Sequence, residues 1–311
     1  MSGADPRASF ASYLERLSAS GFRPSRRFGQ NFLLEPALHR AVVEAAEVGA
    51  DDTVLEIGGG LGFLTRELAA RAARVVVAEI DERLADLLQE DFASQPQVEV
   101  VRGDACGRDD AFAEPLEQAL LRARAAAPSG RLRLAANLPY AVAGPLLVAA
   151  AVREGAEAIA AMGVLVQLEV AERIAAAPHT AEYGSLPALL QSFYRVRLLR
   201  RVGPEVFRPR PRVDSAILAL HAREVVHPAV IHRRHDYARF LRALFGNRRK
   251  TLRHAFDRLV PDWRARPAID ASLATRRAEE LDPDQLAALF AAVGEGTVGD
   301  GGALETPPRP S

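Results

Sequence analysis

The sequence predicts an α/β fold: a Rossmann-like, mostly parallel sheet wrapped by helices, followed by a small C-terminal all-α domain. Between residues 53 and 167, short apolar segments rich in β-branched residues alternate with helical segments. A glycine-rich turn follows the first of these segments, and beyond residue 230 only helical periodicity remains. A chain of 311 residues is long enough for one large or two ordinary domains.

The elements follow one another in a regular order. We expect strands at 53–57, 74–79, 97–102, 131–136 and 158–167, with helices between them at 61–71, 82–92, 110–126 and 141–152. Helices at 170–176 and 185–191 come next, and strands at 194–201 and 215–221 can close the sheet as an antiparallel pair. The C-terminal helices are expected at 236–246, 249–259, 273–280 and 284–293, after a linker at 225–230.

These elements divide the chain into four parts. We expect a flexible leader at 1–22, the sheet domain at 23–224, the helical domain at 225–294 and a disordered tail at 295–311. No apolar run approaches the roughly 18 residues of a membrane span, and the polar N-terminus lacks the apolar centre of a secretory signal. The single cysteine, Cys106, excludes an internal disulfide. We therefore expect a cytoplasmic protein that does not contact membranes.

The basic residues are concentrated in one part of the chain. The net charge is zero, yet residues 195–258 hold 17 of the 40 basic residues and only 5 of the 40 acidic ones. Such a segment favours a polyanionic partner, nucleic acid above all. The plainer alternative is that these arginines lie on ordinary solvated faces.

The most informative motif is Asn137-Leu138-Pro139-Tyr140, which follows the fourth expected strand. Ligands of parallel sheets lie at the carboxyl ends of strands, so the motif belongs at the mouth of a site. The Asn137 side chain and the Leu138 carbonyl can accept hydrogen bonds from an amino group, and Tyr140 can stack on a ring. Pro139 fixes the turn between them. The motif therefore suits a planar base that carries an exocyclic amine.

A second set of residues points to a nucleoside cofactor. Residues 58–62 form a glycine-rich turn at the start of a helix, where backbone N–H groups can approach a ligand. Their spacing does not fit the G-x-G-x-x-G pattern of dinucleotide sites. Glu79 ends the second strand, where it can accept both ribose hydroxyls, and Asp104 follows the third, where it can accept from an adenine amino group. Unless both are merely polar strand ends, they favour S-adenosylmethionine over NAD.

Five motifs occur in the order and spacing of a known family. They are FGQNFL at 28–33, LEIGGGLGFLT at 55–65, NLPY at 137–140, FRPRPRVDSA at 207–216 and FGNRRKT at 245–251. From about residue 26 to residue 290 the chain resembles the rRNA adenine N6-dimethyltransferases, and most closely those that act on the small ribosomal subunit. The resemblance implies a monomer with a seven-stranded class I methyltransferase domain and a helical RNA-binding domain.

The resemblance also implies a reaction and a set of cofactor-binding residues. Two methyl groups pass from S-adenosylmethionine to N6 of each of two adjacent adenosines near the 3′ end of small-subunit rRNA, within a pre-ribosomal particle. The implied cofactor-binding residues are Asn31, Leu33, Gly58, Glu79, Asp104 and Asn137. The sequence departs from the family where Ala141-Val142-Ala143 replace the usual Asn-Ile-Ser after NLPY, and where Gly59 replaces a common Pro.

The expected catalytic residues act by orienting the substrate. Asn137 and the Leu138 carbonyl hold the N6 hydrogens and aim the nitrogen lone pair at the methyl group. Tyr140 and Phe207 are expected to clamp the flipped-out base, although Phe207 could instead be a core aromatic residue. The expected phosphate-binding residues are Arg208, Arg210, Arg212, Arg248, Arg249 and Lys250.

Other functions remain open at this point. A large-subunit rRNA methyltransferase of the antibiotic-resistance type would share the site and differ in its RNA-binding surface. A non-catalytic RNA-binding assembly factor could keep the fold. Four intact residues argue against lost catalysis: Asn137, Tyr140, Glu79 and Asp104. A small-molecule methyltransferase would not need the arginine cluster.

Overall fold

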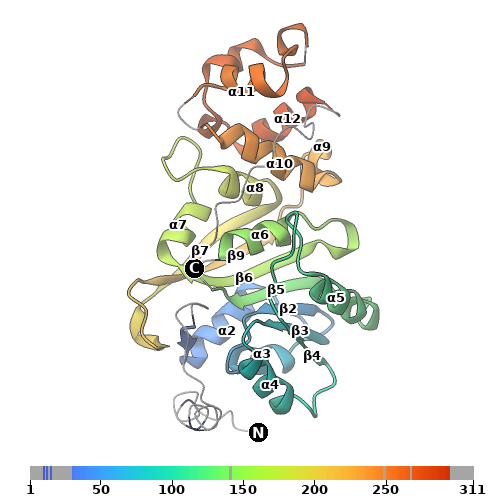
Figure 1. The fold of residues 1–311 in the computed structure, drawn as a ribbon, viewed down its shortest axis with the longest axis vertical. Helices are drawn as coiled ribbons and strands as arrows, with labels where there is room; N and C mark the ends of the chain where they lie inside the picture. The colour runs from blue at the N-terminus through green and yellow to red at the C-terminus, as the bar shows by residue number, and fades with distance from the viewer. Residues whose placement is uncertain are drawn as a thin grey trace.

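The computed structural model describes residues 10, 12, 15, 30–139, 142–247, 250–266 and 268–294. These residues form a seven-stranded sheet with helices on both faces, and further helices gather beyond one end of it (Figure 1). The strand order is β4-β3-β2-β5-β6-β9-β7. Pairing is parallel from β4 to β6 and antiparallel for β9 and β7. The expected fold class is confirmed.

The strands of this sheet lie where the apolar segments predicted them, within one residue at each end. They are β2 (Thr53–Ile57), β3 (Arg74–Glu79), β4 (Val98–Arg102), β5 (Leu132–Asn137), β6 (Ile159–Gln167), β7 (Tyr194–Val202) and β9 (Ser215–Ala222). All five residues of β2 are buried, as expected for a central strand covered on both faces.

Two groups of helices cover the two faces. One face carries α2 (Pro36–Ala45), α3 (Phe63–Ala69) and α4 (Glu82–Asp91), and the other carries α5 (Glu114–Ala126), α6 (Ala143–Ala151), α7 (Leu168–Ile174) and α8 (Ser185–Phe193). We did not expect α2, which begins at a proline and packs on β6 and β9. Helix α5 starts later than predicted because Asp109 and Asp110 have positive φ angles of 54° and 61°, which a helix cannot contain.

A second, two-stranded sheet was also not expected. It pairs β1 (Phe32–Leu33) with β8 (Phe207–Arg208) in antiparallel orientation. The Leu34 N–H donates to the Val206 carbonyl at 2.9 Å and extends this contact. The pairing fastens the segment before α2 to the hairpin between β7 and β9.

The C-terminal helices are α9 (Pro228–Ile231), α10 (Arg234–Phe245), α11 (Leu252–Leu259) and α12 (Pro283–Val293). Helix α9 lies in the expected linker. The prediction of one continuous helix at 273–280 is wrong. The chain forms two short 3-10 helices there, Ala271–Thr275 and Ala278–Glu280. Between them Arg276 is extended, and its carbonyl accepts from the Leu252 N–H at 2.7 Å. This tertiary bond replaces the helical one.

The apolar core runs without a break from the sheet into the C-terminal helices. Leu189 and Phe193 of α8 share one buried cluster with Tyr237 of α10 and Phe290 of α12. Inside it the Ser192 and Tyr237 hydroxyls lie 3.0 Å apart and form a hydrogen bond. The division at residue 224 therefore stays a prediction. None of the described helices has the length and apolar character that crossing a membrane requires.

Candidate functional site

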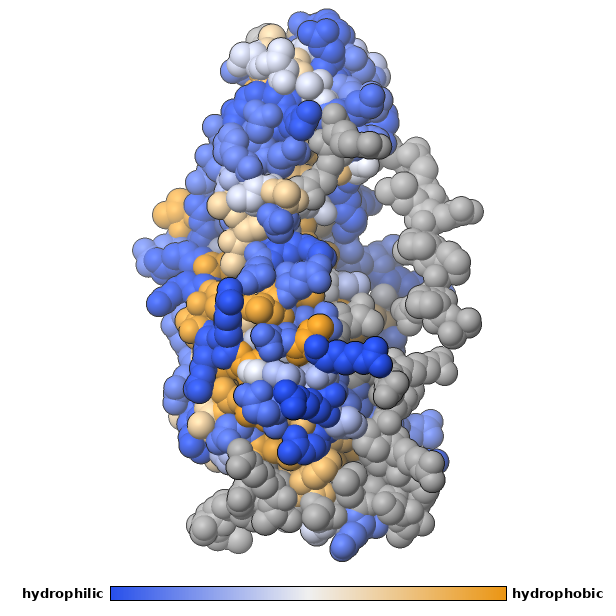
Figure 2. Space-filling model, turned by 90° about the vertical axis from the view of Figure 1, so that its left-hand side faces the viewer, coloured by the Kyte–Doolittle hydropathy of each residue, from blue (hydrophilic) through white to orange (hydrophobic). Residues whose placement is uncertain are grey.

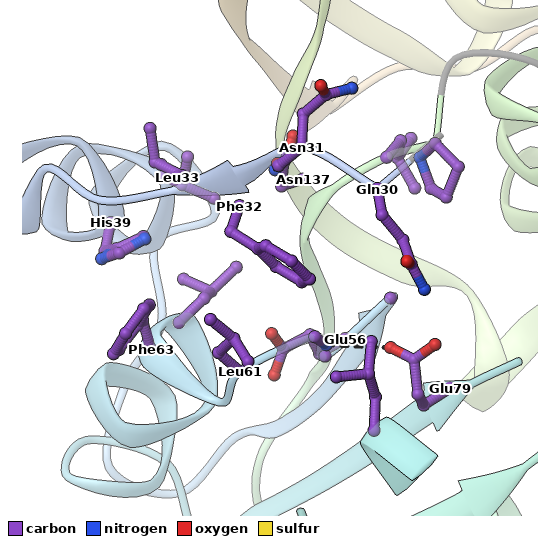
Figure 3. A pocket seen from close by; sticks show the side chains of 18 of the residues that line it. Gln30, Asn31, Phe32, Leu33, His39, Glu56, Leu61, Phe63, Glu79 and Asn137 are labelled. Atoms are coloured by element: carbon purple, nitrogen blue, oxygen red, sulfur yellow. Dashed lines mark hydrogen bonds between the residues drawn. The ribbon is translucent and has the colours of Figure 1, made fainter. Parts of the chain in front are cut away.

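A pocket opens at the carboxyl ends of the parallel strands, where NLPY and the glycine-rich turn meet (Figure 3). The turn after β2, the end of β3 and the end of β5 form its floor. The segment before α2 forms the opposite wall. Of the sequence-predicted residues, the pocket brings together Asn31, Leu33, Gly58, Glu79, Asn137 and Leu138. This is the edge at which α/β sheets bind their ligands.

The glycine-rich turn has a backbone that favours glycine. Gly58 and Gly60 have φ angles of 78° and 56°, in the left-handed region. A Cβ atom on Gly60 would also lie only 3.3 Å from the Phe32 ring. Any side chain at Gly60 would therefore strain the turn and crowd the pocket wall.

Glu79 is fixed at the end of β3 by backbone donors. Its Oε2 accepts from the Gly60 N–H at 2.8 Å, and its Oε1 accepts from the Asp81 N–H at 3.0 Å. The side chain is buried, and this burial raises the pKa of Glu79 above its ordinary value, while the two N–H donors oppose the rise. A buried carboxylate held in this way can accept hydroxyl hydrogens from a ligand in the pocket.

A second carboxyl group, Glu56, was not predicted as a site residue. It lies on β2 two residues before the glycine-rich turn, and it lines the pocket beside Phe32 and Leu61 (Figure 3). Burial raises the pKa of Glu56 to about 8, and the nearby charge of Glu79 adds to the rise. Its buried Oε2 has no hydrogen-bond partner among the described residues. The sequence signal was an acidic residue inside an otherwise apolar strand.

The amide of Asn137 is oriented by the segment before α2. Its Nδ2 donates to the Asn31 carbonyl at 3.2 Å. A carbonyl can only accept, so this contact assigns the nitrogen to the Asn31 side and leaves Oδ1 on the other. Next to it, the Leu138 N–H donates to the Leu165 carbonyl at 3.0 Å. This bond fixes the peptide between Asn137 and Leu138, directly before the peptide that carries the expected acceptor, the Leu138 carbonyl. Tyr140, the stacking residue of the motif, lies outside the described residues.

Two further contacts hold the pocket wall. The Gln30 Nε2 donates to Asp81 Oδ2 at 2.9 Å, across the pocket mouth. Asp81 also caps α4, because its Oδ1 accepts from the Arg83 N–H at 3.1 Å. His39 of α2 lines the pocket as well, and burial lowers the pKa of His39 to about 4, so the ring is neutral at physiological pH. The sequence analysis assigned none of these residues to the site.

Asp104 lies at the correct sheet edge but does not line the pocket. It is the second residue after β4, the strand that pairs with β3, and its Oδ1 accepts from the Cys106 N–H at 2.9 Å. Its expected contact with an adenine amino group stays a prediction.

Phe207 requires a correction. We expected an open ring that can stack on a base, but Phe207 is completely buried, within the core cluster that includes Leu33 and Ile217. The pairing of β1 with β8 places it there. In this conformation it is a core aromatic residue, and a base could reach it only if the side chains that cover it moved.

The expected phosphate-binding residues lie in two places. Arg208, Arg210 and Arg212 are exposed on the hairpin between β7 and β9, although Arg208 also donates to the Glu205 and Phe207 carbonyls. Lys250 is exposed before α11, and Arg248 and Arg249 lie outside the described residues.

Known proteins resemble this chain in sequence and in fold. The sequence profile of the family described as "Ribosomal RNA adenine dimethylase" matches residues 21–292. The chain belongs to this family. Its curated relatives include a "Ribosomal RNA small subunit methyltransferase A" from Pelotomaculum thermopropionicum, 41% identical over 79% of this chain and 81% of the relative. One with the same name from Chlorobium phaeobacteroides is 34% identical over 85% of this chain and 89% of the relative.

Solved structures give the same picture of the fold. A dimethyladenosine transferase from Plasmodium falciparum superposes with a TM-score of 0.64 at 23% identity, over 84% of this chain and 95% of that one. The 23S rRNA methyltransferase ErmE superposes with a TM-score of 0.52 at 27% identity, over 85% of this chain and 99% of that one. Both likenesses extend through most of the chain.

Proposed function

We propose that this protein dimethylates N6 of two adjacent adenosines near the 3′ end of small-subunit rRNA, with S-adenosylmethionine as the methyl donor. The substrate is rRNA within a pre-ribosomal particle, and the protein acts as a monomer in the cytoplasm. The observation that carries the proposal is the orientation of Asn137. Its amide nitrogen is engaged by Asn31, so its oxygen is left to accept a hydrogen bond at the mouth of the pocket.

The residues of the pocket fit S-adenosylmethionine. Glu79 is a carboxylate on fixed backbone donors, suited to the two hydroxyls of a ribose. Gly58 and Gly60 keep the turn free of side chains, so a ligand can approach the backbone N–H groups there. Glu56 lines the same pocket, and its buried Oε2, which has no hydrogen-bond partner among the described residues, can take up a hydrogen bond with a polar group of the ligand.

The chain's own residues orient the acceptor amine. Bound S-adenosylmethionine supplies an electrophilic methyl group. The Asn137 Oδ1 and the Leu138 carbonyl can each accept one hydrogen of the adenine N6 amine. With both hydrogens held, the nitrogen lone pair turns out of the ring plane and toward the pocket. These acceptors bind more strongly as positive charge develops on N6, so they favour the transition state over the ground state.

The large-subunit alternative is weaker for this chain. The likeness to ErmE concerns a 23S rRNA enzyme, but it is more distant than the likeness to the curated relatives named for the small subunit. The site is common to both functions, so the RNA that becomes methylated has to decide between them.

The test is to map methyl groups on ribosomal particles. Unmodified small-subunit particles, incubated with the protein and isotope-labelled S-adenosylmethionine, should acquire two labelled methyl groups on each of two adjacent adenosines, as read by mass spectrometry. Large-subunit particles serve as the control. Label on large-subunit RNA alone would favour the alternative. Tight particle binding with no label on either would favour an assembly factor.

A further inference from the structure

One edge of the sheet carries a row of arginines that the active site does not use. Among the described residues, strand β7 pairs with β9 alone, so no described strand covers its other side, which is a sheet edge. Arg195, Arg197 and Arg200 on this strand are all exposed. The face of the molecule on this side shows strongly hydrophilic side chains interleaved with hydrophobic ones (Figure 2).

A β-bulge places these three arginines on the same face. Arg195 pairs with His221, Arg197 with Ala219 and Arg200 with Ile217, and residues two apart on a strand share a face. In a regular strand Arg197 and Arg200, three residues apart, would point in opposite directions. The register shift between Leu198 and Arg200 adds one residue, Leu199, and returns Arg200 to the face of Arg197. We call Arg195, Arg197 and Arg200 the arginine row.

The charges of the row are only partly balanced by acids. Among the described residues, Arg197 and Arg200 form no ion pair, and Arg195 has one exposed contact with Glu224 at 3.5 Å. The neighbouring Arg201, on the opposite face, pairs with Glu172 of α7 at 2.9 Å. Arg197 and Arg200 therefore differ from Arg201, on the same strand, in having no acidic partner among the described residues. Leu199, which is 45% exposed, adds an apolar element at the centre.

The row also connects two regions of the molecule. Strand β7 begins at the end of α8, on which the C-terminal helices pack, and ends beside Ser215, the residue that pairs with the last residue of β6. Its nine residues span about 26 Å at roughly 3.3 Å per residue. The hairpin with Arg208, Arg210 and Arg212 continues from that end (Figure 1).

We propose that the arginine row is an rRNA-binding surface, which holds the phosphates of a segment running between the C-terminal helices and the pocket. The inference rests on the proposed rRNA substrate. Guanidinium groups that lack acidic partners bind phosphates with charge-assisted hydrogen bonds, and Leu199 can pack against a sugar or base. Contacts with phosphates do not depend on the base sequence of the RNA. The row therefore positions the RNA and does not select the target adenosine.

The test compares variants that remove charge at different places. The double variant Arg197→Gln/Arg200→Gln removes the two arginines of the row that form no ion pair with any described residue. Arg201→Gln, on the other face of the same strand, is the matched control within β7. Arg102→Gln/Arg122→Gln makes the same charge change beside β4, the opposite edge strand.

Binding is measured to small-subunit particles and to deproteinised small-subunit rRNA over a range of salt concentrations. The row variant should lose several-fold in affinity for both, and its salt slope should fall by about two units, one for each lost phosphate contact. Both control variants should have an rRNA affinity and a salt slope close to those of the unmodified protein. Cofactor binding and the methylation rate at saturating particle concentration should be unchanged, while the particle concentration needed for half the maximal rate should rise.

Two results would overturn the proposal. A row variant indistinguishable from its charge-matched control would make the row an ordinary solvated face. If the row variant loses affinity for particles but not for deproteinised rRNA, the β7 edge contacts a ribosomal protein instead. A protein segment could bind there by pairing as an additional strand. If the unmodified protein methylates no rRNA, the proposed function fails instead, and the rRNA affinities still decide whether the row binds RNA.

Discussion

At the carboxyl ends of β3 and β5, Glu79 is buried and Asn137 is half-buried, and each is held by hydrogen bonds with backbone groups. Along β7 the charged side chains are exposed, and two of them have no acidic partner among the described residues. The first region depends on the position of each atom, so substitutions of similar size but different hydrogen bonding should impair it. The second depends on the amount of charge, so it should respond to salt and tolerate changes of shape.

The largest effect is expected at Asn137. Asn137→Ala should lower the methylation rate by at least about 10²-fold, because the acceptor that aims the N6 amine is lost. Cofactor binding and the circular dichroism spectrum should remain those of the unmodified protein. A variant that methylates small-subunit particles at a near-normal rate would show that orientation by Asn137 is not the mechanism.

The next effect concerns stability and its dependence on pH. The folded protein holds a proton on Glu56 up to about pH 8, whereas the unfolded chain releases it near 4.5. The free energy of unfolding should therefore fall as the pH rises from 4.5 to 8, by up to about 1.4 kcal/mol per pH unit from this group. Glu56→Gln should remove that contribution and stabilise the protein above pH 8, as followed by denaturant unfolding. An unchanged pH profile would contradict the buried, protonated Glu56.

Cofactor affinity should depend on Glu79. Glu79→Ala should weaken the binding of S-adenosylmethionine by roughly 1–3 kcal/mol, because a buried hydroxyl pair loses its acceptor. Isothermal titration calorimetry measures the change. Asp104→Ala in the same assay tests whether Asp104, in the loop after β4, contacts the cofactor: a contact predicts weaker binding. Normal affinity in the double variant would exclude both carboxylates as cofactor contacts.

The smallest change per residue is expected for the basic motif before α11. Replacing Arg248, Arg249 and Lys250 by alanine should lower rRNA affinity and reduce the salt slope by about one unit for each lost contact. Cofactor binding should not change, because Lys250 is not among the residues that line the pocket. If the triple variant has the same salt slope as the unmodified protein, these three residues do not bind phosphates. The arginines of the β7–β9 hairpin would then be the next candidates.

The sequence predicted correctly those parts of the molecule that depend on neighbouring residues in the chain, such as apolar runs and the turns that end them. Strands β2 and β3 have the predicted bounds because their apolar runs end at a glycine-rich turn and at Glu79. The strand ends then placed Gly58, Glu79 and Asn137 in one pocket, since parallel strands share an edge.

The parts that it could not predict depend on non-local contacts. The pairing of Leu33 with Phe207 joins residues far apart in the chain through two-residue strands, too short for any periodic signal. That pairing buries Phe207 and brings Asn31 to Asn137, so both the correction and the decisive hydrogen bond follow from it. The bulge at Leu199 was likewise invisible, because the register depends on the partner strand.

The unbroken core between the sheet and the C-terminal helices limits how this architecture can diversify. Removing α10 and α12 would expose the apolar side of α8, including Phe193, to water. The helical part therefore cannot be exchanged like a detachable module, and the whole described chain should melt in a single cooperative transition. A change of RNA target in this fold is therefore expected at exposed side chains, such as those along β7, rather than through exchange of the helical part.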